Sequence, residues 1–355
     1  MVGGAVVFGA CSSQKTDESY EAVARRTWCH TEGRVDNRSL MQRDLVRYAT
    51  LAPSSHNTQC WKFRIEDHTI SILPDLSRRC FSVDPDDHHL FVSLGCAAEN
   101  LIQAALANGL KGESRFETAA TGELAIALEP TKAFASPLFN AIPVRQCTRA
   151  EFDGKLLPNE ELRLLEQVGR GKGVRVILLT EKTAMEKVLE YVVEGNSAQM
   201  NDPAFIAELK SWIRFNDDEA IRTGDGLFSR LSGNPSVPRW LGSTFFGMFF
   251  RPKNENDKYA KQVRSSAGLA VFVSDVEDKA HWVEAGRCYE RFALQSAALG
   301  IHNAMLNQPV EVASVRPQFA SFLGMGRRRP DLVVRFGRGP KMPQSLRRPV
   351  QAVLA

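Results

Sequence analysis

The sequence predicts an α+β fold built from two similarly organised halves. Apolar residues between positions 45 and 52 recur at helical spacing, whereas Trp61, Phe63 and Ile65 alternate with polar residues as in a half-buried strand. Helical and strand-like segments follow one another in this way along most of the chain. Neither element type is confined to one region, so we expect helices and sheets to share the same domains.

Two long apolar segments indicate the internal repeat. Residues 93–108 and 280–299 are both predicted to be helices, and a glycine ends each of them. When residue 95 is laid on residue 286, an offset of 191, Gly95 and Glu99 coincide with Gly286 and Glu290. A match of this kind suggests two halves of common design, with the two long helices packed at the centre.

Composition limits the classes of protein that the chain can represent. Its 355 residues, 43% hydrophobic and 24% charged, allow one large or two ordinary globular domains. The formal net charge of +4 gives no argument for nucleic acid, and no apolar run reaches the roughly 18 residues that span a bilayer. Seven cysteines form no CxxC pair, and the adjacent His88 and His89 are expected to be solvated. We predict no metal site.

The N-terminal 38 residues are predicted to form a tail outside the fold. Residues 1–11 are apolar and small, and Cys11 lies in a setting that loosely resembles a lipobox. The segment is therefore either the remnant of an export signal or an ordinary N-terminal tail. The first alternative implies a periplasmic or membrane-anchored protein, and the second a cytoplasmic one.

Residues 39–143 are predicted to form the first half. Ser39 and Gln42 have the spacing of a capping box that opens a helix ending near Ala52. A strand over 61–66 and the apolar positions Ile70 and Ile72 indicate a hairpin. A polar loop over 74–90, the helix over 93–108 and a strand near 124–128 complete this half.

Residues 144–355 are predicted to form the second half, interrupted by an insertion. The predicted elements are a helix at 159–168, a strand at 174–180, helices within 182–214, a strand at 268–273, the helix at 280–299 and a strand at 331–336. The insertion, residues 216–264, shows little periodicity but carries Phe245, Phe246, Phe249 and Phe250. It is interpreted either as a packed lid or as a buried helical plug.

The segment from Pro53 to Trp61 forms a polar turn between the first helix and the first strand. Pro53 ends the helix, because the residue before a proline is disfavoured in the α region. The turn brings two hydroxyls, an amide and unpaired backbone groups together, which suits a flat heterocycle rich in donors and acceptors. The alternative is a turn whose serine and asparagine side chains cap their own backbone.

Three segments resemble the FMN-dependent nitroreductase family. The stretch APSSHNTQCW, residues 52–61, is similar to the family's APSxxNxQPW turn. RQCTR at 145–149, followed by Phe152 and Leu157-Pro158, is similar to its RxSxR segment, and residues 337–349 resemble its basic C-terminal tail. Family members are usually homodimers in which each flavin lies between two subunits.

The order of these segments resembles the fused, double-length, Acg-like branch of the family. The turn lies in the first half, whereas the RxSxR-like segment and the basic tail lie in the second. The resemblance implies mainly antiparallel sheets wrapped by helices, in a pseudo-dimer with one flavin site per chain. Such a chain needs no stable partner subunit, and its partner is a small-molecule electron acceptor.

The resemblance also implies the cofactor-binding residues. Ser54, Ser55 and Asn57 would hydrogen-bond the flavin, Pro53 would shape the turn and Gln59 would support it. A phosphate needs guanidinium groups, and a cation near N1 and O2 of the flavin favours hydride acceptance. The predicted cofactor-binding residues of the second half are Arg145, Arg347 and Arg348 for the phosphate, Arg149 for the flavin ring, and Cys147 and Thr148 beside it.

Two residues depart from the family pattern. Cys147 stands in place of the usual serine, and Cys60 in place of the proline before Trp61. Either thiol could react with a flavin, but a buried, inert cysteine is the commoner case. No residue is nominated as a general acid or base, so the list of catalytic side chains is empty.

Two functions follow from the resemblance. The first is an FMN-dependent oxidoreductase that takes hydride from NAD(P)H and passes electrons to a quinone, a nitroaromatic or a similar acceptor. The second is an FMN-binding storage or sequestration protein, in which the aromatic insertion covers the flavin and turnover is small.

Overall fold

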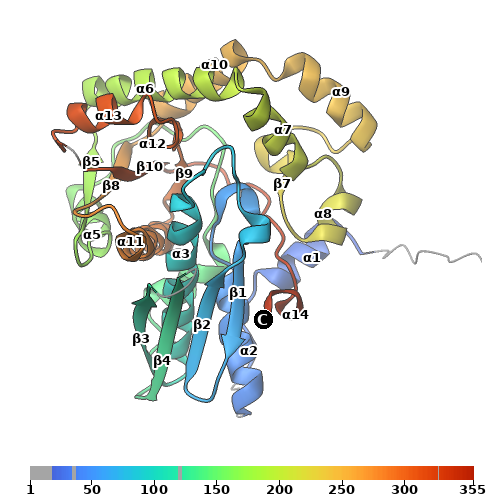
Figure 1. The fold of residues 1–355 in the computed structure, drawn as a ribbon, viewed down its shortest axis with the longest axis vertical. Coiled ribbons are helices and arrows are strands. Elements are labelled where there is room, and N and C mark those ends of the chain that lie inside the picture. The colour runs from blue at the N-terminus through green and yellow to red at the C-terminus, as the bar shows by residue number, and fades with distance from the viewer. Residues whose placement is uncertain (1–17, 34–36, 119–121, 327) are drawn as a thin grey trace, which may run out of the picture.

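The computed structural model describes residues 18–33, 37–118, 122–326 and 328–355, and it confirms the α+β prediction (Figure 1). Two four-stranded sheets, both antiparallel throughout, have the strand orders β1-β2-β4-β3 and β5-β8-β10-β9. One sheet falls in each predicted half. The strands of the two sheets are β1 (Trp61–Ile65), β2 (Thr69–Pro74), β3 (Leu110–Glu117), β4 (Glu123–Pro130), β5 (Val174–Leu179), β8 (Gly268–Ser274), β9 (His302–Met305) and β10 (Pro330–Gly337).

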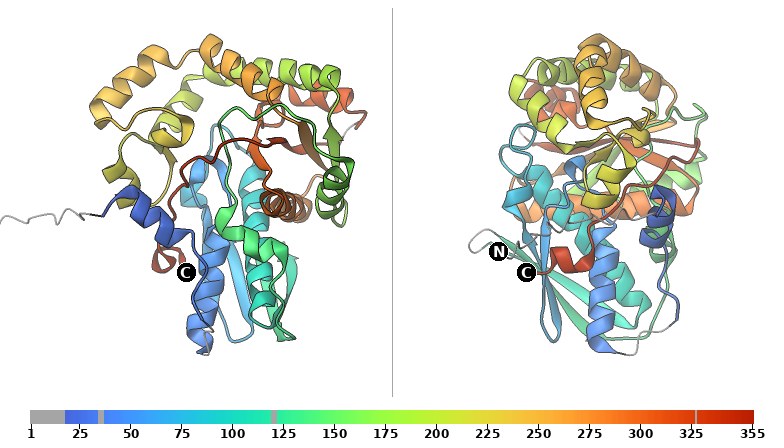
Figure 2. Two further views of the ribbon diagram at one scale, coloured as in Figure 1. Left: turned by 180° about the vertical axis from the view of Figure 1, so that it is seen from behind. Right: turned by 90° about the vertical axis from the view of Figure 1, so that its right-hand side faces the viewer.

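Helices fill the space between the sheets and cover the outer face of the second sheet (Figures 1 and 2). A short parallel pair, β6 (Ile213–Arg214) and β7 (Leu227–Phe228), lies apart from both sheets. The helices are α1 (Tyr20–Thr27), α2 (Arg38–Thr50), α3 (His88–Ala107), α4 (Pro137–Ala141), α5 (Asn159–Val168), α6 (Lys182–Met200), α7 (Pro203–Trp212), α8 (Asp217–Thr223), α9 (Arg239–Phe249), α10 (Pro252–Arg264), α11 (Lys279–Ala298), α12 (Gln308–Glu311), α13 (Arg316–Phe322) and α14 (Val350–Val353).

The two long helices, α3 and α11, pack against each other at the centre through glycine. A Cβ atom added to Gly95 would lie 1.9 Å from the carbonyl oxygen of Val283, and one added to Gly286 would lie 1.9 Å from that of Val92. The 191-residue offset of the sequence match carries one contact onto the other, because it takes Gly95 to Gly286 and Val92 to Val283. Reciprocal contacts of this kind are what a two-fold axis produces in a homodimer. The internal match therefore marks a pseudo-two-fold axis between the helices.

The first half opens at a cap two residues before the predicted one. Helix α2 begins at Arg38, and the side chain of Asn37, not Ser39, accepts a hydrogen bond from the Leu40 amide at 3.1 Å. Asparagine is among the best N-cap residues, so it takes the position ahead of the serine. Gln42 is then free to donate to the Glu66 carbonyl at 2.8 Å, which ties α2 to the turn of the predicted β1–β2 hairpin.

Helix α3 starts earlier than its apolar pattern indicates, and the expectation that His88 and His89 are solvated is wrong. Asp84 accepts hydrogen bonds from the amides of His89 and Leu90, which caps the helix inside the predicted polar loop. Both histidines are buried: Nε2 of His88 lies 2.9 Å from Oδ1 of Asp331, and Nε2 of His89 lies 3.0 Å from its carbonyl oxygen. Their partner is 243 residues away in sequence, which is why the local pattern did not reveal it.

Helix α3 is also apolar and long enough to cross a membrane, contrary to the sequence expectation. Its most apolar window is 78% buried inside the protein. A helix that is covered on most sides by its own chain belongs to the core of the fold. The burial against α11 accounts for its composition.

The insertion over 216–264 is mostly helical. It contains α8, α9 and α10, and α10 packs along α6 across the outer side of the second sheet (Figure 1). Gly242 is the one residue of α9 that is buried among those described, so α9 is not a buried plug. It extends from the edge of the molecule instead (Figure 2).

The chain returns to the first half at its C-terminus. After β10, residues 338–349 run as an extended segment along the boundary between the halves to α14 (Figure 2). The amide of Ala355 donates to the Phe63 carbonyl at 2.8 Å, and Leu354 forms an isolated parallel bridge with Phe63. The tail of the second half therefore lies against the edge of the first sheet.

Candidate functional site

A cavity of about 580 Å³ lies between the two halves. The first half lines it with the turn at 53–56 and the start of α3, and the second half with residues of the 145–149 segment, α12 and the insertion. Pockets that bind small molecules and cofactors typically enclose 300 to 1,000 Å³. The cavity brings together the turn and the RQCTR segment, as the resemblance predicts.

The turn at Pro53–Gln59 has an unusual backbone. His56, Asn57 and Gln59 have φ angles of 49°, 53° and 54°, in the left-handed region. This conformation is rare for residues other than glycine and is concentrated at functional sites and tight turns. The turn aims Ser54, Ser55 and His56 into the cavity, while Asn57 and Gln59 point to its rear.

Asn57 and Gln59 attach the turn to the second half. The Asn57 amide donates to the carbonyls of Gly226 and Leu346, and the Gln59 amide donates to that of Gly224 at 2.8 Å. The side-chain oxygen Oε1 of Gln59 accepts a hydrogen bond from the Arg348 backbone amide at 2.8 Å. These bonds agree with the supporting role predicted for Gln59, and they assign Asn57 the same kind of position. Pro53, Ser54 and Ser55 line the cavity, and the Ser54 hydroxyl also accepts a hydrogen bond from the Gln59 backbone amide at 2.9 Å, which caps the turn.

Arg149 and Cys147 line the cavity from the second half. The guanidinium group of Arg149 has no hydrogen bond or ion pair with another side chain in the described part of the chain. Arg149 lines the cavity together with His56 and Tyr259, and its positive charge contributes to the lowered pKa of His56. An arginine without a carboxylate partner in a cavity wall is a ready receptor for an anion.

Arg145 and Arg347 lie behind the cavity wall, where both are held by the protein. Nε of Arg145 lies 3.2 Å from Oε1 of Glu290, and both side chains are buried. Arg347 donates to the carbonyls of Thr50, Leu51 and Ala52 and to Oδ1 of Asn57. Burial, followed by the charge of Arg145, lowers the pKa of Arg347 to about 9.

Arg348 and Thr148 also lie outside the cavity lining. The Arg348 guanidinium donates to the Ala352 carbonyl at 2.7 Å, and burial lowers its pKa. The Thr148 side chain donates to Gln146, and its amide donates to the Asn303 carbonyl. Their contact with a flavin, like that of Arg145 and Arg347, stays a prediction. In this conformation the side chains of Arg145, Arg347, Arg348 and Thr148 all interact with other residues of the protein around the cavity.

The two cysteines that depart from the family pattern differ in exposure. Cys60 is buried behind the turn, and burial raises the pKa of its thiol to about 12, which keeps it protonated. Cys147 lies in the cavity wall, with Sγ 3.9 Å from the Tyr289 hydroxyl. Thiolates, not thiols, are the reactive form, so Cys60 is an inert core residue.

The sequence analysis did not assign His56 a role, although it lies within the motif. Its Nε2 is buried without a hydrogen-bond partner, and its ring lines the cavity. Burial, followed by the charge of Arg149, lowers the pKa of His56 to about 4. The imidazole is therefore neutral at physiological pH and offers a bound ligand one donor or acceptor.

Replacing His56 by asparagine should weaken the acid sensitivity of the fold. Because the folded pKa lies below the usual 6.5, the unfolded chain binds more protons between pH 6.5 and 4, and stability falls as the pH drops through this window. Asparagine tolerates the positive φ and does not titrate. Thermal unfolding midpoints measured from pH 7 to pH 4 should fall less steeply for His56→Asn than for wild type. If the midpoints of His56→Asn and wild type fell equally with pH, the lowered pKa assigned to His56 would be contradicted.

Aromatic side chains from the insertion form the opposite wall of the cavity. Phe245, Phe246, Phe249 and Phe250 all line it, and the rings of Phe246 and Phe250 are stacked with centroids 4.4 Å apart. Two of the lining side chains, Arg149 and Lys258, carry positive charge. Glu255 and Glu311 add two carboxylates to the same lining, so the cavity has an aromatic wall facing a polar turn with charges of both signs, a chemistry suited to a flat polar ligand.

The position that the pseudo-two-fold axis relates to the cavity carries charged side chains. Val92, Ser93 and Cys96 of α3 line the cavity, and the 191-residue offset carries Ser93 and Cys96 to Glu284 and Arg287 of α11. At that position Nη1 of Arg287 forms an ion pair with Oε2 of Glu284 at 3.0 Å. Nη1 of Arg291 forms a second ion pair with Oε2 of Glu99 at 2.9 Å. Paired charges therefore occupy the equivalent position on α11.

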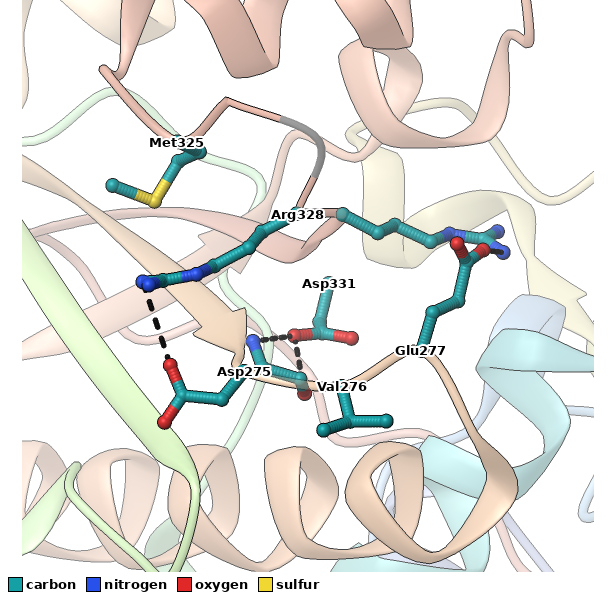
Figure 3. A pocket seen from close by; sticks show the side chains of 8 residues that line it. Asp275, Val276, Glu277, Met325, Arg328 and Asp331 are labelled. Atoms are coloured by element: carbon teal, nitrogen blue, oxygen red, sulfur yellow. Dashed lines mark hydrogen bonds and ion pairs between the residues drawn. The ribbon is translucent and has the colours of Figure 1, made fainter.

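A second, smaller pocket of about 360 Å³ lies at the end of β8, lined by residues 274–277 and by residues between α13 and the start of β10 (Figure 3). Its charged residues are paired with neighbours: Arg328 with Asp275 at 3.4 Å, and Arg329 with Glu277 at 3.0 Å. Asp331 accepts from the amide and hydroxyl of Ser274. None of the residues predicted to bind a cofactor lies in this pocket.

Comparisons with known proteins place the chain among nitroreductase-like sequences, although no family model matches it. "Putative NAD(P)H nitroreductase Rv3131" of Mycobacterium tuberculosis (strain ATCC 25618 / H37Rv) is 24% identical over 327 residues, 88% of this chain and 90% of the relative. "Putative NAD(P)H nitroreductase acg" of the same strain is 23% identical over 325 residues, 87% of this chain and 93% of the relative.

Solved structures with some similarity to this chain include two nitroreductases. A nitroreductase with bound FMN from Bacteroides fragilis covers 58% of this chain and 89% of its own, at 13% identity and a TM-score of 0.36. The FMN-dependent nitroreductase NfnB from Mycobacterium smegmatis, in complex with NADPH, covers 61% and 91%, at 13% identity and a TM-score of 0.38.

The full-length relatives confirm the resemblance that the three motifs indicate. The two Mycobacterium tuberculosis sequences align with nearly the whole of this chain, including both predicted halves. The chain is therefore related to proteins named as NAD(P)H nitroreductases, one of which carries the name acg.

Proposed function

We propose that the protein is an FMN-dependent oxidoreductase that takes hydride from NAD(P)H and reduces a small-molecule acceptor. The observation that carries the proposal is the cavity in which the Pro53–His56 turn faces Arg149 across the boundary between the halves. The nitroreductase names of the full-length relatives support the same conclusion. The acceptor class proposed is a quinone or a nitroaromatic compound.

The residues that line the cavity fit a flavin mononucleotide. His56 presents a buried nitrogen without a partner, and Arg149 and Lys258 present the cationic groups that a flavin ring and a phosphate need. The phenylalanine wall offers an apolar face to the dimethylbenzene end. FMN, when bound, supplies the hydride-accepting and hydride-donating chemistry.

The protein's own contribution is to orient and to stabilise charge. Arg149 would offset the negative charge that develops when a flavin is reduced, and a preorganised cation in a cavity of low polarity is effective in this role. The turn, attached through Asn57 and Gln59, would keep its hydroxyls at fixed positions. The aromatic wall would exclude water from the reacting atoms.

The visible spectrum under anaerobic conditions tests this function. The protein, incubated with FMN and freed of excess, should show a flavin band that bleaches on addition of NADPH or NADH. The band should return when a quinone or a nitroaromatic is added. A bound flavin that neither nicotinamide reduces would overturn the proposed activity while leaving flavin binding intact.

The second candidate function is storage or sequestration of FMN. It is favoured by the position of α9, whose phenylalanines line the cavity where a substrate would stack on the flavin. In this case the insertion acts as a lid that limits turnover.

Shortening the lid side chains distinguishes the two functions. In Phe245→Ala/Phe246→Ala the aromatic wall loses two rings, so turnover with NADPH and a quinone should rise several-fold if the insertion limits access. Trp240→Ala, on the outward side of the same helix, is the matched control and should leave turnover unchanged. Equal rates for the double variant and wild type would show that these two residues do not restrict the site.

A further inference from the structure

Side chains of the types that bind metal ions meet at the start of α3. One ring nitrogen of His88, one of His89 and one carboxylate oxygen of Asp84 lie within 4.8 Å of one another, and all three side chains are buried. Glu311 of α12 adds a second carboxylate, because its Oε1 lies 3.5 Å from Nδ1 of His89. These four residues, named here the α3 cluster, offer two imidazoles from the first half and one carboxylate from each half.

The hydrogen bonds of the two histidines leave one nitrogen free on each ring. Nε2 of His88 lies 2.9 Å from Oδ1 of Asp331, and Nε2 of His89 lies 3.0 Å from the Asp331 carbonyl oxygen. Carboxylate and carbonyl oxygens accept, so each Nε2 carries the hydrogen and each Nδ1 presents a lone pair. Both Nδ1 atoms are buried without a hydrogen-bond partner among the described residues.

Metal-bound histidines have the same arrangement. Their second ring nitrogen donates to a carboxylate or a backbone carbonyl, which fixes the ring and its tautomer. Asp331 supplies both kinds of acceptor here, and its other carboxylate oxygen is held by the amide and hydroxyl of Ser274 (Figure 3). The supporting residues of a metal site are therefore in place around His88 and His89.

The charges of the α3 cluster also lack a partner. Burial lowers the pKa of His88 well below its ordinary value and lowers that of His89, so both rings are neutral at physiological pH. Burial raises the pKa of Asp84 to about 7 and also raises that of Glu311. A buried carboxylate is stabilised by a nearby cation, and a divalent ion would balance two of them.

Two arginines act electrostatically on His88, but both are engaged elsewhere. Arg329 pairs with Asp86 and with Glu277, and Arg316 donates to backbone carbonyls. Neither arginine forms an ion pair with a carboxylate of the α3 cluster in the described part of the chain. The cation that the cluster lacks is therefore not supplied by these neighbours.

We propose that the α3 cluster binds one divalent transition-metal ion of the zinc type, although the sequence analysis predicted no metal site. Zn²⁺ takes imidazole nitrogen and carboxylate oxygen ligands in tetrahedral sites, whereas Mg²⁺ and Ca²⁺ prefer oxygen alone. Two ligands of one tetrahedral zinc lie about 3.3 Å apart. The 3.5 Å between Nδ1 of His89 and Oε1 of Glu311 is close to this value.

The ion would join segments that are distant in sequence. Asp84 and the histidines lead into α3 of the first half, whereas Glu311 belongs to α12 and Asp331 to β10 of the second. Four protein ligands define a structural site, because no coordination position is left open for a substrate. His89 and Glu311 also line the large cavity, so the ion would brace one wall of it. This role does not depend on the proposed function.

Zinc titration of the full-length, untagged and flavin-free protein tests the site after treatment with a chelator. Wild type should retain one Zn²⁺ per chain after gel filtration. Its unfolding midpoint should rise by about 5 °C when free zinc is about 100 times the dissociation constant, and EDTA should reverse the rise. Wild type that retains no zinc would overturn the proposal without bearing on flavin binding.

Two variants locate the ion. His88→Gln/His89→Gln keeps amide donors for Asp331 but removes both free ring nitrogens, so retained zinc should fall roughly tenfold or more. Glu311→Gln, which removes one negative charge, should weaken zinc binding by about tenfold. Circular dichroism confirms that each variant is folded. A folded double histidine variant that binds zinc as tightly as wild type would overturn the assignment.

Cys80→Ser is the matched control, because Cys80, His56 and Glu208 form another group of metal-binding residue types in the described chain. Zinc binding should be unchanged in this variant. Cobalt bound to wild type should show the visible absorption of a tetrahedral site without the sulfur-to-cobalt charge-transfer band that a cysteine ligand adds. Zinc lost in Cys80→Ser but kept in the double histidine variant would move the site to Cys80 and overturn the proposal.

Discussion

Replacing Gly286 by alanine is expected to destabilise the protein by about 3 kcal/mol or more. The added Cβ would lie 1.9 Å from the Val92 carbonyl oxygen and 2.8 Å from its carbonyl carbon. These are backbone atoms of a buried helix, so they cannot rotate away as a side chain could. The two central helices would have to separate by more than an ångström.

The same argument applies to Gly95, and it predicts that the two substitutions are coupled. Gly95→Ala should cost about as much as Gly286→Ala, because the two contacts are related by the pseudo-two-fold axis. Once α3 and α11 have separated for one methyl group, much of the space for the other exists already. The double variant should therefore lose less stability than the sum of the single variants.

Thermal or urea unfolding midpoints of the flavin-free protein measure these effects. Gly247→Ala in α9 is the control, since a Cβ there meets no atom within 4 Å and alanine is the better helix former. Its midpoint should rise slightly. If either central glycine accepted alanine as easily as Gly247 does, the close crossing of the two helices would be wrong.

Arg149→Ala is expected to weaken FMN binding by a factor of 10 to 100. A charge-assisted hydrogen bond contributes roughly 1.5 to 3 kcal/mol, and Arg149 has no other partner in the described chain to compete for its guanidinium group. For the same reason, the unfolding midpoint of the flavin-free variant should equal that of wild type. Arg149→Lys should recover part of the affinity, because it keeps the charge but loses the paired donors.

Isothermal titration with FMN measures the dissociation constants. Arg115→Ala is a suitable control, because Arg115 is 81% exposed at its side chain and pairs with Glu117 on the outer strand of the first sheet. Its affinity for FMN should not change. Unchanged affinity in Arg149→Ala would remove Arg149 from the site, whereas a large loss of stability would make it a structural residue like Arg347.

The sequence predicted the elements that carry a strong local signal. Helices α3 and α11 were found because their apolar runs are long and end at glycine, and Gly109 has the positive φ of 79° expected at a helix C-terminus. Strand β3 was missed because charged and polar residues occupy most of its outer positions (LKGESRFE), as is common for an edge strand. The helices of the insertion were missed because glycine and phenylalanine dominate α9.

The candidate site was predicted where its residues share a motif, and missed where partners are distant in sequence. The turn and Arg149 could be proposed from their segments alone. The carbonyls that hold Arg347 belong to Thr50, Leu51 and Ala52, almost 300 residues earlier in the chain. No local pattern reveals that such an arginine is occupied, nor that Lys258 reaches the cavity from α10. These assignments depend on the tertiary structure.

Native mass spectrometry after incubation with FMN tests the central claim most directly, namely that the two halves of one chain form a single flavin site. The expected species is one chain carrying one FMN, which is lost in Arg149→Ala. Two FMN per chain would contradict the view that paired charges around Glu284 and Arg287 close the second position. A flavin held only by a dimer, or no bound flavin at all, would contradict the site between the halves.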